Sequence, residues 1–216
     1  MKLVAMQTSI ILLAAGKGLR FTQHDSSTIK QLAMFEKNTL LQHAINQLQP
    51  LQHNQECHLY IALGANRSVI EATLPTSVTT ISSENWHLGM GHTLADSIDF
   101  LTQQKSATTK NDTADITHIM LALVDQPLIT LKHYQTLLGA SRDNPNNIIA
   151  TQSNKVLMPP AIFPRQYFDE LGRLTGDVGA AKILKKYHND VISINNNKAQ
   201  FDTDTPEQLA RVVEHM

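Results

Sequence analysis

Short apolar runs alternate with longer polar and amphipathic segments along this chain. Runs with the length and composition of strands occupy residues 10–13, 58–63, 78–82, 118–124, 147–150 and 191–194. Helices are expected between these runs. One lies in the segment that Asn38 or Thr39 can cap and Pro50 ends, and others lie at 68–74, 93–103, 130–138, 165–171 and 179–187, and after Thr205. Residues 159–164 are expected to be extended because prolines exclude a helix there.

This order of elements predicts a three-layer α/β fold with a mostly parallel sheet, formed by one domain over residues 1–216. The polar segments 21–28 and 104–115 are predicted to be surface loops. Ligands of such sheets bind beyond the carboxyl ends of the strands. The residues that follow each strand are therefore the first candidates for function.

The first strand runs directly into a small-residue turn with the sequence Leu-Ala-Ala-Gly-Lys-Gly-Leu-Arg at 13–20. Gly16 and Gly18 allow positive φ, and the backbone amides of such a turn can point at an anion. Lys17 and Arg20 add positive charge beside them. The pattern is compatible with phosphate binding and, equally, with an ordinary turn that binds nothing. A Walker loop and a dinucleotide fingerprint are both poor matches, since Phe21 stands where the latter has its third glycine.

The most hydrophobic strand ends at Asp125, just before Gln126 and Pro127. A carboxylate at this edge is a suitable Mg²⁺ ligand, because Mg²⁺ is usually bound by one or two carboxylates together with substrate phosphates. The alternative is an aspartate that serves only the turn or the following helix.

Three further glycine or aspartate segments precede expected helices. Gly89 and Gly91 come before Thr93, which can cap the helix 93–103, and the nearby histidines 87 and 92 fit polar loop positions better than a metal pair. Asp177, in Gly-Asp-Val-Gly-Ala, either caps the next helix or faces a substrate. Residues 202 and 204 are both acidic, so one can cap the last helix while the other meets a metal.

Composition narrows the function classes. The formal net charge of −1 argues against general nucleic-acid binding, and no apolar run approaches a membrane span. Cys57 is the only cysteine, which excludes an intramolecular disulfide, and we interpret it as a small side chain near a strand start. Residues 1–8 do not resemble a signal peptide, so a cytoplasmic location is expected.

Taken in order, these motifs resemble the molybdenum cofactor cytidylyltransferase group of the MobA-like nucleotidyltransferases. The resemblance rests on Leu-Ala-Ala-Gly-x-Gly-x-Arg, Lys-Gln-Leu at 30–32, Gly-Met-Gly-x-Thr-Leu at 89–94, Leu-Val-Asp-Gln-Pro at 123–127, Gly-Asp-x-Gly-Ala at 176–180 and Asp-x-Asp-Thr-Pro-Glu at 202–207. It implies a Rossmann-like, GT-A-type α/β fold of the nucleotide-diphospho-sugar transferases. The implied enzyme is a Mg²⁺-dependent nucleotidyltransferase that moves CMP from CTP to the terminal phosphate of molybdenum-molybdopterin and releases pyrophosphate.

The resemblance also implies roles for single residues. The catalytic residues would be Arg20, Lys30 and Asp125, with Lys30 at the α-phosphate. Mg²⁺ would be bound by Asp125 and Asp204, with Asp202 as a substitute for the latter. Nucleotide and cofactor would be bound by Leu13, Ala14, Ala15, Gly16, Gly18, Gly64, Gly91, Thr93 and Asp177, and the segments 159–163 and 176–180 would line the pterin site.

The expected partners are CTP, a molybdopterin-type cofactor and, transiently, a molybdoenzyme or its chaperone. Transfer from GTP or to another phosphate acceptor is the nearest alternative. A non-catalytic nucleotide- or cofactor-binding maturation factor is an alternative of another class. A NAD-dependent oxidoreductase is disfavoured, because the third glycine and an acidic residue at the end of the second strand are both missing.

Overall fold

The computed structural model describes residues 6–21, 28–54, 56–103 and 116–214. Most of the predicted loops 21–28 and 104–115 lies outside these residues, as do residues 1–5 of the segment compared with a signal peptide. No described helix combines the length and the apolar composition that a membrane span requires.

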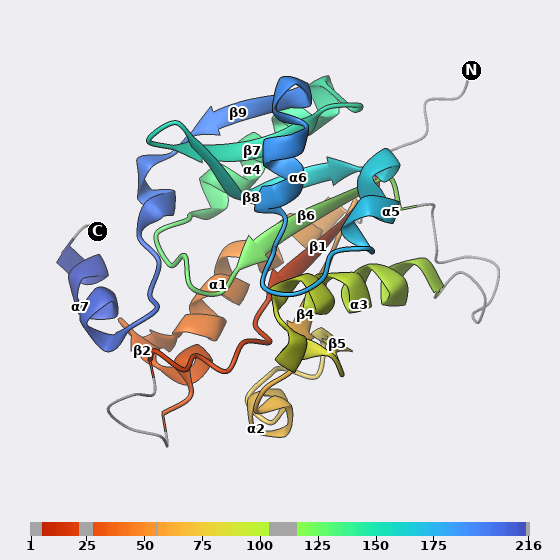
Figure 1. Ribbon diagram of the computed structural model, residues 1–216. Helices are drawn as coiled ribbons and strands as arrows, with labels where there is room; N and C mark the ends of the chain where they lie inside the picture. Colours follow the sequence, from red (N-terminus) through yellow and green to blue (C-terminus); the bar gives the residue numbers. More distant parts are fainter. Residues whose placement is uncertain (1–5, 22–27, 55, 104–115, 215–216) are drawn as a thin grey trace.

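A seven-stranded sheet forms the centre of the molecule (Figure 1). Its strands, in spatial order, are β5 (Thr79–Ser82), β4 (Cys57–Leu63), β1 (Thr8–Leu13), β6 (His118–Leu123), β8 (Val156–Pro164), β7 (Ile148–Ser153) and β9 (Val191–Asn195). Only β8 runs against its neighbours β6 and β7; the other pairings in this sheet are parallel. The predicted mostly parallel α/β fold is therefore confirmed.

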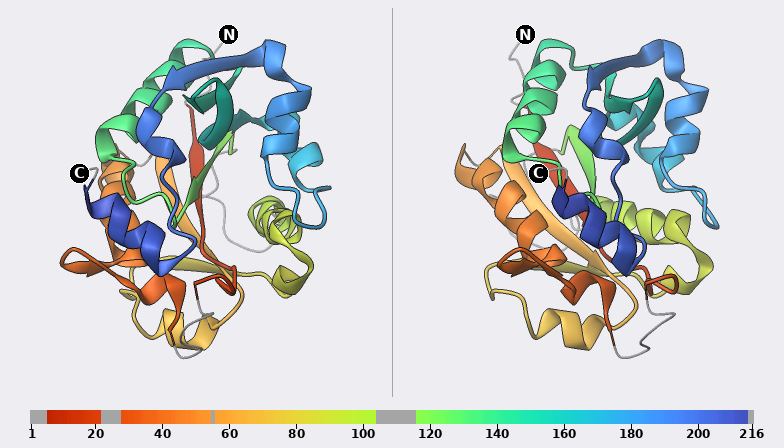
Figure 2. Two further views of the ribbon diagram at one scale, coloured as in Figure 1. Left: turned by 60° about the vertical axis from the view of Figure 1, so that its left-hand side comes forward. Right: turned by 90° about the vertical axis from the view of Figure 1, so that its left-hand side faces the viewer.

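Helices cover both faces of the sheet, which gives three layers (Figure 2). The helices are α1 (Leu40–Leu48), α2 (Arg67–Glu71), α3 (Met90–Gln103), α4 (Leu131–Asp143), α5 (Phe168–Leu171), α6 (Ala181–Lys186) and α7 (Pro206–Glu214). The small hairpin of β2 (Met34–Phe35) and β3 (Asn38–Thr39) precedes α1.

Strand β1 explains why the first apolar run is continuous rather than alternating. Ile10 and Leu12 pack into the core that α1 and α4 complete, whereas Ile11 and Leu13 pack into the core that α3, α5 and α6 complete. A parallel strand with helices on both sides needs apolar residues on both faces. The full burial of β1 fixes the position of the turn that follows it.

Helix boundaries differ from the predictions where tertiary contacts decide them. Helix α3 begins at Met90, so Thr93 is a buried residue inside the helix and not its cap. Helix α6 has Ala180 at its N-cap position, so Asp177 does not cap it. The predicted caps Thr39 and Thr205 are confirmed, because the hydroxyl of each accepts a hydrogen bond from the amide three residues on.

A buried histidine makes stability depend on pH. Nε2 of His133 lies 2.8 Å from the hydroxyl of Thr151, which itself donates to the carbonyl of Pro160. Because that hydroxyl hydrogen is used, Nε2 of His133 must carry the proton and donate. Burial lowers the pKa of His133 below its ordinary value of 6.5.

We expect the free energy of unfolding to fall as the pH falls from 7 to 5, since the unfolded chain then binds protons that folded His133 resists. The variant His133→Gln keeps a donor at the position of Nε2 and should flatten this dependence. Urea unfolding followed by circular dichroism measures the free energy of unfolding at each pH. His58→Gln, which replaces an exposed histidine of β4, is the control and should show the same change of this free energy with pH as the wild type. Equal slopes for wild type and His133→Gln would show that His133 makes no such contribution.

Candidate active site

A cavity of about 530 Å³ opens at the carboxyl ends of β1 and β6. The register places the two strand ends side by side, with Leu13 opposite Leu123. One wall is the turn after β1, and another is the segment from Trp86 to Met90 that leads into α3. The fold thus places a hollow at the edge where the sequence predicted a ligand.

The turn after β1 lies directly against the short 3-10 helix η1 (Lys30–Leu32). Gly18 has a φ of +65°, and a Cβ added there would lie 2.9 Å from Cβ of Lys30. A side chain at position 18 would therefore be strained in its backbone and would also press on Lys30. Glycine at this position lets the turn approach the lysine closely.

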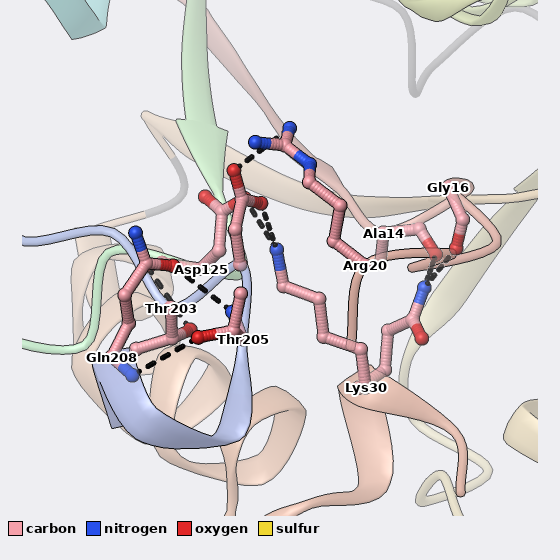
Figure 3. Close-up of polar contacts among 10 residues, drawn as sticks. Ala14, Gly16, Arg20, Lys30, Asp125, Thr203, Thr205 and Gln208 are labelled. Atoms are coloured by element: carbon pink, nitrogen blue, oxygen red, sulfur yellow. Dashed lines mark hydrogen bonds and ion pairs between the residues drawn. The ribbon is translucent and has the colours of Figure 1, made fainter. Parts of the chain in front are cut away.

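Lys30 joins two carboxylates that are far apart in the sequence (Figure 3). Its Nζ donates to Oδ2 of Asp125 at 2.9 Å and to Oδ1 of Asp204 at 2.8 Å, across 95 and 174 residues of chain. Nη2 of Arg20 lies 2.9 Å from the other oxygen of Asp204. The predicted catalytic residues and both predicted metal ligands are thus brought into one ionic network.

The backbone around Asp204 is held by hydrogen bonds of its own (Figure 3). The amide of buried Thr203 donates to the carbonyl of Asp125 at 3.0 Å. One residue past Asp204, the hydroxyl of Thr205 accepts from the amide of Gln208, and the side chain of Gln208 accepts from the amide of Thr205. This capping box fixes the start of α7, and with it the position of Asp204.

The positive charge of Lys30 is stabilised in this network. Burial alone lowers the pKa of Lys30, but the carboxylates of Asp125 and Asp204 outweigh it and raise the pKa above its ordinary value. Lys30 is therefore an ammonium ion at neutral pH. Partial desolvation, and then the negative charges of Asp204 and Asp125, raise the pKa of the Asp202 carboxyl at the exposed rim.

Asp125 and Asp204 can supply some, but not all, of the ligands that a divalent cation needs. No group of three or more His, Cys, Asp or Glu side chains within the described segments could hold a metal ion. Asp125 and Asp204 nevertheless converge on one point, now taken by the ammonium of Lys30, and Oδ1 of Asp125 is buried without a described hydrogen-bond partner. Two carboxylates with a free oxygen suit Mg²⁺ when phosphates supply further ligands.

Most of the residues predicted for the site lie around this cavity. Those that line it are Leu13, Ala14, Ala15, Gly16, Gly18, Arg20, Lys30, Thr93, Asp125, Asp177 and Asp204. The predicted residues that do not line it are Gly64, Gly91, the alternative metal ligand Asp202, the segment 159–163 and, apart from Asp177, the segment 176–180. Gly64 lies behind Trp86, and Gly91 packs on the backbone of Thr175 while its amide donates to Gly176.

The roles of Trp86 and Gln31 at the cavity were not predicted from the sequence. Trp86 forms part of its wall and covers Gly64, and Gln31 donates from Nε2 to the carbonyls of Ala14 and Gly16. A single tryptophan beside two glycines, and a glutamine directly after the predicted phosphate-binding lysine, were the available signals. Neither signal predicts a contact with the cavity, because the neighbours of Trp86 and Gln31 in space are not their neighbours in the sequence.

Most of the chain matches the model of a known protein family. A family model described as the MobA-like NTP transferase domain matches residues 10–191. Among curated proteins, the bifunctional protein GlmU of Pseudomonas putida is 27% identical over 226 residues, which cover 96% of this chain and 45% of that protein. The chain therefore spans less than half the length of this relative.

Solved structures share the fold over nearly the whole chain. Rv0371c from Mycobacterium tuberculosis H37Rv has a TM-score of 0.73 at 22% identity, with 97% of this chain and 98% of that chain covered. A structure of Rv0371c described as a complex with manganese has a TM-score of 0.69 at 20% identity, with 98% and 100% covered. Molybdopterin-guanine dinucleotide biosynthesis protein A from Archaeoglobus fulgidus has a TM-score of 0.64 at 13% identity, with 96% and 97% covered.

Gly64 tests the packing of the cavity wall. A Cβ at this position would lie 2.4 Å from Cβ and Cγ of Trp86, so Gly64→Ala should displace the indole and cost about 1–3 kcal/mol of stability. Trp86 is the only tryptophan, so the emission spectrum of the protein reports its environment directly.

Gly139→Ala in α4 is the matched control, because a Cβ there meets nothing within 4 Å. It should leave the emission unchanged and stabilise the helix by roughly 0.5–1 kcal/mol. Emission and urea midpoint both unchanged in Gly64→Ala would refute the close contact between Gly64 and Trp86.

Proposed function

Because the chain belongs to the family of MobA-like NTP transferase domains, we propose that it transfers CMP from CTP to the terminal phosphate of a molybdopterin-type cofactor. The main support for this proposal is the ionic network of Lys30, Arg20, Asp125 and Asp204 beside the glycine turn. The network places the cations that would bind phosphates and the carboxylates that would bind a metal at one wall of a single cavity. The proposed catalytic residues are Arg20, Lys30 and Asp125.

The chemistry is a displacement at phosphorus. An oxygen of the acceptor phosphate attacks the α-phosphorus of CTP and forms the new P–O bond. The bond from this phosphorus to the bridging oxygen of the β-phosphate breaks, and pyrophosphate leaves with the electron pair. Such a reaction asks the protein mainly to position two anions in line and to neutralise the charge that develops.

Positive charge is supplied by residues of the cavity wall. Lys30 is an ammonium at neutral pH and can exchange the two carboxylates for phosphate oxygens. Arg20, whose side chain is 70% exposed, can turn from Asp204 to the leaving pyrophosphate. Each such donor typically contributes a hundredfold or more to the rate of reactions of this kind.

Magnesium is the proposed cofactor, with Asp125 and Asp204 as its ligands. When bound, it would supply positive charge to the phosphates of the nucleotide. The structure of Rv0371c described as a manganese complex supports a divalent cation in a protein of this fold. The free oxygen of Asp125 gives this chain a ligand that no described side chain satisfies.

The segments 159–163 and 176–180 are proposed to face the pterin acceptor, and of their residues Asp177 lines the cavity. Thr93, which also lines it, is proposed to approach the base and ribose of the nucleotide, while Gly64 and Gly91 would act through the packing of Trp86 and the 175–176 backbone. The molybdopterin acceptor is supported by the sequence motifs and by the fold shared with the Archaeoglobus protein. A molybdoenzyme or its chaperone would receive the product.

Transfer from GTP, or to a different phosphate acceptor, is the second candidate. The name of the Archaeoglobus protein refers to a guanine dinucleotide, and the GlmU relative is named as a bifunctional protein. This candidate keeps the nucleotidyl transfer of the family and changes only its substrates.

Pyrophosphate release in the presence of Mg²⁺ distinguishes these proposals. The protein is incubated with molybdopterin and each nucleoside triphosphate in turn, and we expect release with CTP. Release with GTP alone would replace the cytidylyl proposal by the guanylyl one. Tight nucleotide binding without release from any triphosphate would instead indicate a binding factor.

Asp125→Asn tests the proposed role of the strand-end carboxylate. We expect turnover to fall by about a hundredfold or more, because the metal ligand is lost, while circular dichroism shows a folded chain, since Lys30 keeps Asp204 as a charged partner. Asp99→Asn, on the exposed surface of α3, changes the same charge away from the cavity and should retain wild-type turnover. Near-wild-type kinetics of Asp125→Asn would exclude this role.

A further inference from the structure

Gln31 is buried beneath the glycine turn and binds two of its carbonyl groups. Gln31 is only 2% exposed, and its Nε2 donates to the carbonyl of Ala14 at 2.7 Å and to the carbonyl of Gly16 at 2.8 Å. Both hydrogens of one side-chain amide are thus used on one short loop. The dashed lines at Ala14 and Gly16 in Figure 3 mark these bonds.

These two bonds fix which way the neighbouring amides point. In a trans peptide, the carbonyl of one residue and the N–H of the next point in opposite directions. Because Gln31 holds the carbonyls of Ala14 and Gly16 on its own side, the N–H groups of Ala15 and Lys17 must point away from it. Ala15 and Lys17 both line the cavity, and neither amide donates to any acceptor in the described segments.

Packing alone does not account for a glutamine at this position. Oε1 of Gln31 is buried and has no partner among the described residues. Leaving a buried acceptor unpaired costs about 1–3 kcal/mol, a cost that an apolar side chain of the same length would avoid. The advantage of glutamine here is its pair of N–H donors.

We propose that Gln31 is a positioning residue that turns the amides of Ala15 and Lys17 toward a phosphate of the nucleotide. It acts through the backbone and does not touch the substrate. Lys30, its neighbour in η1, would bind the same triphosphate through its side chain, so one turn of 3-10 helix serves both the charge and the backbone donors. The inference rests on the proposed nucleotidyl transfer but concerns only how the turn is set to bind phosphate.

The test uses the full chain, labelled with ¹⁵N, and sodium pyrophosphate without added metal. In the wild type, we expect the amide signals of Ala15 and Lys17 to shift on titration. In Gln31→Met, which keeps the length but has no donor, the dissociation constant for pyrophosphate by calorimetry should rise by about tenfold or more.

Gln126→Met is the matched control. Gln126 is also buried, also donates from Nε2 to two backbone carbonyls, those of Pro159 and Ala199, and also has an unpartnered Oε1. Both variants should lose similar stability, but Gln126→Met should bind pyrophosphate with the wild-type constant. This contrast separates positioning of the turn from a general loss of stability.

Two results would overturn the inference. One is an unchanged pyrophosphate constant in Gln31→Met, and the other is binding to the wild type that leaves the amide signals of Ala15 and Lys17 in place. The second measurement needs no variant, so it holds even where Gln31→Met does not fold. If the wild type still releases pyrophosphate from a nucleoside triphosphate, either result leaves the proposed function standing.

Discussion

The ammonium group of Lys30 is the constraint on which the cavity depends. It is buried, it is charged, and it is satisfied by carboxylates from the end of β6 and from the loop before α7. A buried charge that loses its partners is costly, so these three segments are stable only in each other's presence. The same pairs bring together the side chains that we propose as donors for a phosphate and as ligands for a cation. The stability of the site and its proposed chemistry therefore use the same groups.

The sheet provides the frame within which this pairing becomes possible. Parallel pairing of β1 with β4 and β6 in one register aligns their carboxyl ends, so the residues that follow each strand meet at one edge. Side chains then refine the frame: Gln31 orients the turn after β1, and Trp86 fills the space above Gly64. Glycine is required where a side chain presses closely on the backbone, Lys30 at position 18 and Trp86 at position 64. Rigid strand ends and small residues together leave a defined hollow.

The sequence allowed the fold class to be predicted because local patterns carry it. The apolar run of β1 and the cap residues Thr39 and Thr205 depend on neighbours along the chain, and they were identified correctly. The antiparallel insertion of β8 between β6 and β7 was not foreseen, because strand order depends on long-range pairing. The start of α3 at Met90 was missed for a similar reason, since the amide of Gly91 finds its acceptor on Gly176, 85 positions away. The candidate residues Lys30, Asp125 and Asp204 were named from motifs, but their direct contact with one another was not.

The cavity wall has one further property, which concerns its electric field. Its cations are Lys17, Arg20 and Lys30, and its carboxylates are Asp125, Asp177 and Asp204, so the formal charges of the wall cancel. With a net charge of −1 on the whole chain, little long-range attraction acts on a polyanion in solution. A nucleoside triphosphate, the proposed substrate, would therefore not be steered from a distance and would gain its binding energy only on contact. Encounter rates with such a ligand should thus be set by diffusion and orientation and depend only weakly on ionic strength.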